Sequence, residues 1–232
     1  MLRGRTVRPT PLTSRAALTA FLVIVATAVY LLLEYPSLPE LLPVHFRHGG
    51  PDGWQYRTLP RVLIPVGVQT MLAVVFAAIA ALLLSRPHGD EDHTAPDVRA
   101  AGVAAEAVMV TALIWVTFQG YAAFALARMW VSGQATLPLY NLVEALCGTA
   151  SLVVAVRAHR RLGRPDPREY VATHWRLGQL YKNPEDPALF VPSRDGRRWT
   201  LNFGRPVAGA LLGVVLVLGV IAPTVLIALA LR

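Results

Sequence analysis

The fold of this chain is decided around residues 157–205, whose sequence is RAHRRLGRPDPREYVATHWRLGQLYKNPEDPALFVPSRDGRRWTLNFGR. This polar stretch holds 11 of the 22 lysines and arginines, and long apolar runs flank it on both sides. Only 16% of all residues are charged and the mean hydropathy is +0.46, which lies outside the range of ordinary soluble domains. We therefore interpret the stretch as a loop between two membrane-spanning segments.

Five apolar runs approach or reach the roughly 20 residues that a helix needs to cross about 30 Å of hydrocarbon. They are residues 16–33, 62–84, 103–127, 139–156 and 207–231. The first run follows a basic tail, as in a signal peptide, but its small-x-small triplet lies inside the apolar run, which favours an uncleaved anchor. We therefore predict an all-α integral membrane protein with five transmembrane helices.

Basic residues are distributed unevenly around these runs. Residues 1–15, 85–102 and 157–206 carry 17 of the 22 lysines and arginines, and the rest of the chain carries 5. Cytoplasmic loops are enriched in basic residues, so we predict an N-in/C-out topology with residues 34–61 and 128–138 outside. Arginine outnumbers lysine 21 to 1, which favours a high-GC bacterial source and hence a bacterial inner membrane. The net charge of +8 follows this topology, and we expect no direct binding of nucleic acid.

The loop at residues 34–61 contains the first candidate site. Its prolines disfavour a regular helix, and residues 49–53 form a dense turn signal. His45, His48 and Asp52 could hold a divalent cation, although such a set is also typical of an ordinary loop, and we predict no metal. The candidate ligand-binding residues are His45, Phe46, Asp52, Gly53 and Trp54.

A second set of candidates consists of polar residues in or beside the apolar runs. They are Glu106, Gln119, Arg128, Asn141 and Glu144. An ionisable group at the centre of a span costs about 2.5–3.5 kcal/mol, so each is expected to have a partner or a function. An ion pair between Arg128 and Glu144 could fix helix register, or Glu144 could take part in transport or proton relay.

The third candidate region is the cytoplasmic segment, predicted to be small and α+β. Residues 165–177 are expected to form a short amphipathic helix ended by Gly178. Residues 188–191 and 199–203 are expected to pair as a hairpin around Asp195 and Gly196. The candidate partner-docking residues are Trp175, Tyr181, Asn183, Asp186, Phe190, Trp199 and Asn202. The alternative is that the aromatic residues among them form a small core.

Two stretches carry a family resemblance. Residues 38–54, LPELLPVHFRHGGPDGW, contain Pro-x-His-Phe and Gly-x-Pro-Asp-Gly-Trp and resemble the motif after the first span of bacterial membrane proteins of the Sdp-type toxin-immunity family. Residues 174–206, with Asn183-Pro184, Asp186-Pro187 and the string WTLNFGRP, are similar to a short cytoplasmic module in relatives of that family. The resemblance implies protection against a secreted peptide and recruitment of a regulatory protein to the membrane.

The sequence therefore predicts a membrane protein of the immunity or signalling type. Its predicted partners are an extracellular peptide or envelope component, a cytoplasmic regulatory protein and anionic lipids. Two alternatives are a transporter built on the polar residues of the spans and a structural organiser that packs through Gly209 and Gly213. The sequence contains no nucleophile elbow, phosphate-binding loop or carboxylate dyad, so we expect neither enzyme activity nor a cofactor.

Overall fold

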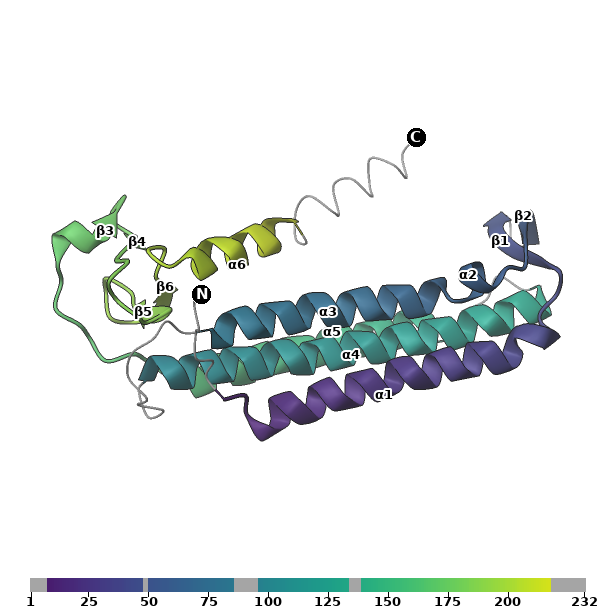
Figure 1. The fold of residues 1–232 in the computed structure, drawn as a ribbon, viewed down its shortest axis with the longest axis horizontal. Helices are drawn as coiled ribbons and strands as arrows, with labels where there is room; N and C mark the ends of the chain where they lie inside the picture. The colour runs from purple at the N-terminus through teal and green to yellow at the C-terminus, as the bar shows by residue number, and fades with distance from the viewer. Residues whose placement is uncertain (1–7, 48–49, 86–95, 134–138, 218–232) are drawn as a thin grey trace, which may run out of the picture. The chain divides into compact units, whose positions relative to one another are not determined.

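A computed structural model describes residues 8–47, 50–85, 96–133 and 139–217 of the chain. Most of these residues are helical, and four helices are long and apolar enough to cross a membrane. They are α1 (Pro11–Glu34), α3 (Ile64–Leu84), α4 (Pro96–Ser132) and α5 (Tyr140–Leu162), which lie side by side in Figure 1. The first four predicted runs are therefore confirmed as helices of spanning length.

The fifth predicted run is described only in part. Helix α6 (Pro206–Leu216) begins where the apolar run begins, with its proline in the first turn, where no intrahelical N–H is needed. Residues 218–231 of the run lie outside the described residues. The fifth span and the N-in/C-out topology stay predictions.

Several helix ends differ from the predicted segment boundaries. Helix α4 has 37 residues, about 55 Å at 1.5 Å per residue, and so extends into both predicted loops beside it. Helix α5 continues to Leu162, which places Arg157, Arg160 and Arg161 on its last turns. The run at 62–84 is broken, because a short helix α2 (Leu59–Val62) precedes α3. Pro65 has no N–H to donate to the carbonyl four residues back, which explains the break.

The loop between α1 and α2 forms an antiparallel hairpin. A short 3-10 turn, η1 (Tyr35–Ser37), leads into β1 (Leu41–Arg47), which pairs with β2 (Gly50–Tyr56). The prediction that the prolines disfavour a regular helix here is confirmed. Strand β2 already begins at Gly50, inside the predicted turn at residues 49–53, and the pairing is irregular on both sides of His45, where the register skips first Val44 and then Asp52.

The stretch from residue 163 to residue 205, here called the polar module, contains little regular structure. It has a 3-10 turn η2 (Ala172–His174) and four short strands: β3 (Trp175–Arg176), β4 (Leu180–Tyr181), β5 (Phe190–Pro192) and β6 (Trp199–Leu201). The predicted hairpin is confirmed, because β5 pairs antiparallel with β6. Its turn is closed by a hydrogen bond of 2.7 Å from the N–H of Ser193 to the carbonyl of Arg198.

The helix predicted for residues 165–177 is wrong. Two prolines, Pro165 and Pro167, hold the residues before them in extended conformations. Gly178 does not end a helix but lies at φ +73° between the paired strands β3 and β4, beside Leu177 at φ +50°. The spacing of apolar residues predicts a helix here, but the two prolines and the tight turn at Gly178 prevent it.

A buried glutamine, Gln69, connects three of the apolar helices by hydrogen bonds. The amide nitrogen of Gln69, on α3, donates to the hydroxyl of Thr27 (3.2 Å) on α1 and to the carbonyl of Val116 (2.9 Å) on α4. Gln69 is fully buried, and a Cβ on Gly120 would lie only 3.2 Å from its amide nitrogen. A small residue at 120 is therefore needed for these three helices to share the polar contact.

Candidate functional site

The β1–β2 hairpin lies on a hydrophobic platform. The buried residues of this platform are Leu31, Leu38, Leu42, Val62, Ala123, Ala127 and Trp130. Leu42 is the hairpin's own contribution and is fully buried, which fixes the start of β1 against the helices. The platform draws on α1, α2 and α4 as well as the hairpin, which ties the hairpin to the helices.

Arg57 clamps the start of the hairpin. Its guanidinium nitrogen Nη1 donates to the carbonyls of Tyr35 (2.8 Å), Pro36 (3.1 Å) and Leu38 (2.5 Å). The same group lies 4.9 Å from the centre of the Tyr35 ring, and the backbone N–H of Arg57 donates to the carbonyl of Glu40 (2.7 Å). A single cation thus holds η1 against the end of β2, a role that the sequence did not predict.

The face of the hairpin opposite Leu42 is exposed and largely apolar. The register places Leu41 opposite Tyr56 and Pro43 opposite Trp54, so these residues share a face, on which Pro43 itself is buried. Leu41, Trp54 and Tyr56 are 47%, 51% and 67% exposed, and we call them the aromatic face. Trp54 was predicted as a ligand-binding residue, and the structure places it on this surface.

The other predicted ligand residues meet at the irregular part of the hairpin. The imidazole Nδ1 of His45 contacts the Oδ1 of Asp52, and both side chains are exposed to solvent. Gly53 lies opposite His45, where a Cβ would come within 2.9 Å of the His45 Cβ. Any side chain at position 53 would therefore crowd the Cβ of His45. The side chain of Phe46 and the whole of His48 lie outside what the structure describes, and no cluster of three metal-ligating residues occurs among the described residues.

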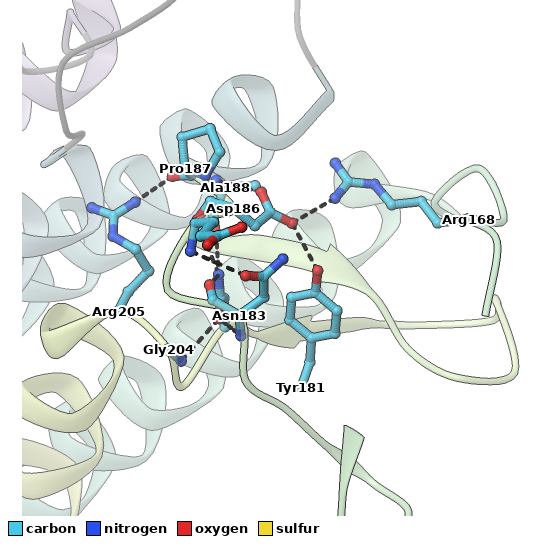
Figure 2. A network of polar contacts seen from close by, with 10 residues as sticks. Arg168, Tyr181, Asn183, Asp186, Pro187, Ala188, Gly204 and Arg205 are labelled. Carbon is cyan, nitrogen blue, oxygen red and sulfur yellow. Dashed lines mark hydrogen bonds and ion pairs between the residues drawn. The ribbon is translucent and has the colours of Figure 1, made fainter. Parts of the chain in front are cut away.

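Asn202 organises the polar module. Its side-chain oxygen accepts from the backbone N–H groups of Asn183 (3.0 Å) and Gly204 (2.9 Å). Its side-chain nitrogen donates to the carbonyls of Asn183 (2.8 Å), Asp186 (3.1 Å) and Ala188 (3.2 Å), a network drawn in Figure 2. Asn202 is fully buried. Its side chain supports the fold of the module and is not available at the surface, where we had expected it.

Two neighbours of Asn202 complete this arrangement. A Cβ on Gly204 would lie 2.4 Å from the carbonyl carbon of Asn183 and 2.5 Å from the nitrogen of Pro184, so only glycine fits. Arg205 is buried and its Nη1 donates to the carbonyl of Pro187. The Asn-Pro and Asn-x-Gly-Arg strings therefore encode close packing of two loops.

Asp186 links the loop to an exposed cation and to an aromatic ring. Its Oδ2 accepts from Arg168 (2.9 Å) and from the hydroxyl of Tyr181 (3.1 Å), and its Oδ1 accepts from the backbone N–H of Ala188 (2.9 Å) (Figure 2). Burial raises the pKa of Tyr181 above its ordinary value, although a hydrogen bond with Asn183 lowers it in part. The neighbouring carboxylate of Asp186 also raises this pKa.

The aromatic residues predicted for docking are partly buried. Trp175 and Tyr181 pack edge to face with ring centres 5.3 Å apart, and Tyr170 stacks on Trp175 at 6.4 Å. A small cavity of about 50 Å³ lies beside these rings. Phe190 and Trp199 are also half-buried. The rings thus form a small core with some exposed edges.

The polar residues predicted within the spans occupy different environments. Glu106 is buried and accepts from the hydroxyl of Thr10 (2.7 Å) and from Nη1 of Arg161. Arg128, Asn141 and Glu144 are exposed, and Gln119 is half-buried. Among the described residues no ion pair joins Arg128 to Glu144, so the predicted pairing is not found. On α6, a Cβ at Gly209 or Gly213 meets nothing within 4 Å among the described residues, so the structure gives no close approach at these glycines.

Comparison with known proteins gives one match. Residues 22–70 match the family model described as a domain of unknown function, DUF1648. This region starts within α1, contains the whole hairpin with its Arg57 clamp, and ends in α3 at the residue after Gln69. No curated protein and no solved structure matches the chain.

Proposed function

We propose that this chain is a multi-pass bacterial inner-membrane protein of the immunity or signalling type, related to the Sdp-type family. Its β1–β2 hairpin would bind an extracytoplasmic peptide or envelope component, and its polar module would dock a cytoplasmic regulatory protein. The observation that carries the proposal is the aromatic face, which is exposed while the strand beneath it is fixed by the platform and by Arg57.

Rigid support and exposed aromatic rings are properties of binding surfaces. Tryptophan and tyrosine are enriched among the residues that dominate binding energy, and a surface held in one conformation loses little entropy on binding. The hairpin sheet has two strands, so an extended peptide can add to an edge by backbone hydrogen bonds. The exposed pair of His45 and Asp52 lies on the same hairpin and offers polar contacts.

Photo-crosslinking in cells tests this function. A photoreactive amino acid at position 54 or 56 is expected to capture a peptide or envelope component, because both positions lie on the aromatic face. Gln55 is the matched control, since it is exposed on the same strand but points to the opposite face. Equal capture from position 55, or no capture from 54 and 56, would contradict the proposal.

The topology is testable with the same chain, because Cys147 is its single cysteine. In a Cys147→Ser background, a cysteine at Gln55 should react with a membrane-impermeant thiol reagent added to intact spheroplasts. A cysteine at Arg197, in the polar module, should react only after the membrane is opened. The reverse labelling pattern would contradict the N-in/C-out orientation.

A further inference from the structure

A basic cavity lies where the ends of two long helices meet the polar module. It has a volume of about 410 Å³, within the range of small-molecule sites. Its walls come from the first turns of α4, the last turn of α5, residues 163–166 and Trp199. None of the predicted sites except Trp199 contributes to it.

Four arginines line this cavity: Arg99, Arg160, Arg161 and Arg164. The guanidinium of Arg161 is paired with the buried carboxylate of Glu106, which fixes the last turn of α5 against α4. Asp166 offsets a further charge at the cavity wall. Within the part of the chain that the structure describes, no ion pair involves Arg99, Arg160 or Arg164. Among the residues that the structure describes, the lining therefore holds more arginines than carboxylates.

The cavity is also partly apolar. Val103, Leu162 and Trp199 contribute to its lining together with the arginines. The indole nitrogen of Trp199 donates to the carbonyl of Leu162 (3.3 Å), which holds the ring at the end of α5. Val103 is the first residue of the predicted span at 103–127, so this predicted topology would place the cavity at the cytoplasmic membrane surface, and the proposal below rests on that placement.

We propose that this cavity binds the phosphate of an anionic phospholipid headgroup. Guanidinium groups bind phosphate oxygens through paired hydrogen bonds, and basic pockets between helices at the cytoplasmic surface bind anionic headgroups. The apolar part of the lining fits the start of an acyl chain, which a free phosphate ion lacks. This proposal stands apart from the function of the hairpin, because it requires no peptide and no regulatory protein.

The test measures phosphatidylglycerol bound to the purified full-length chain in zwitterionic detergent, by native mass spectrometry over a lipid titration. Replacing Arg99, Arg160 and Arg164 with glutamine removes three basic residues, each worth about fivefold in affinity at an anionic surface, so affinity should fall about 100-fold. The matched control replaces Arg176, Arg197 and Arg198 with glutamine, which removes the same charge from exposed positions that do not line the cavity. The control should lose less than about fivefold.

Three further results of this experiment would overturn the proposal. Equal loss of affinity in the cavity and control variants would overturn the proposal, because it would indicate general surface attraction. Inorganic phosphate that binds as tightly as phosphatidylglycerol, dependent on the same arginines, would show that the acyl chain contributes nothing and would overturn the lipid assignment. If the glutamine variant does not fold, the variant with lysine at the three positions keeps the charge and loses the guanidinium fork. It is expected to bind about 10-fold more weakly than the parent chain, and unchanged affinity would overturn recognition by the arginines.

Discussion

The β1–β2 hairpin and the polar module are both small antiparallel structures, but they are stabilised in different ways. The hairpin depends on a hydrophobic platform and a single arginine, and it leaves an aromatic face exposed. The polar module has very short strands and depends on the buried amide of Asn202, which makes four hydrogen bonds to the loop at residues 183–188 and one to Gly204 in its own loop. The distinctive residues therefore have different roles in the two regions. In the module, Asn202 and Gly204 secure the packing of two loops, whereas in the hairpin Trp54 and Tyr56 are exposed to solvent.

The strongest test of the module is Gly204→Ala. The added methyl group would overlap backbone atoms of Asn183 and Pro184, which cannot move away as a flexible side chain could. We expect the module to lose about 3 kcal/mol or more, measured as faster hydrogen exchange over residues 183–204. Gly209→Ala is the matched control, because its Cβ meets nothing within 4 Å in the described part of the chain and alanine favours the helix. Similar exchange in both variants would contradict the packing role of Gly204.

The corresponding test of the hairpin is Arg57→Met. This change keeps most of the side chain's volume but removes hydrogen bonds to three carbonyls. Hydrogen bonds from charged groups are worth about 1.5–3 kcal/mol, so we expect about 2 kcal/mol of lost stability. Hydrogen exchange of the β1–β2 amides should accelerate about 30-fold. Arg61→Met, which removes a contact with the carbonyl of Tyr56 alone, should have a smaller effect. An equal effect of the two changes would argue against a clamp at Arg57.

A smaller structural effect is expected on the aromatic face. Trp54→Ala removes an exposed ring, and cross-strand pairs contribute only about 0.2–1 kcal/mol. Thermal unfolding should therefore change little, while capture of a ligand by a photoreactive residue at position 56 should be lost. Retained capture with lowered stability would instead identify Trp54 as part of the hairpin's structure.

The smallest expected effect is a pH dependence of the module. The pKa of Tyr181 is raised by burial, with a further contribution from Asp186, so the folded state favours the neutral phenol. Its contribution to stability is complete below the ordinary pKa of 10.0 and is lost as pH rises through the higher value of the folded state. Hydrogen exchange of the module at matched chemical exchange rates should show this loss. Tyr181→Phe should remove it, because phenylalanine does not titrate.

Much of the helical architecture was predictable because apolar length alone specifies it. The four described long helices coincide with predicted runs, and the β5–β6 hairpin follows from its Asp-Gly turn. The break before α3 and the missing helix at 165–177 depend on individual prolines, which outweigh the average hydrophobicity of a window. The prolines were visible in the sequence, and more weight on them would have corrected the second prediction.

The polar contacts were less predictable, because they depend on helix rotation and on backbone carbonyls. The sequence predicts a partner or function for Gln119 and Asn141, yet the fully buried amide of the long helices is Gln69, and Asn141 is exposed. The role of Arg57 is not predictable from the sequence, because its partners are carbonyls that no side-chain pattern identifies. For Asn202, the sequence showed a distinctive string but not whether its side chain pointed outward. The nearby residues Pro184, Pro187 and Gly204 indicated that the two loops pack closely.

The platform beneath the hairpin also has a consequence for the order of assembly. Leu31 and Trp130 share this core although about 100 residues separate them along the chain, whereas the side-chain contacts of Asn202 reach back at most 19 residues. Contacts between distant segments form late, because the intervening chain must first be brought together. The polar module can therefore close soon after its own synthesis. The hairpin obtains its full support only after α4 has joined the other helices, so its aromatic face would be completed well after its own strands have been synthesised.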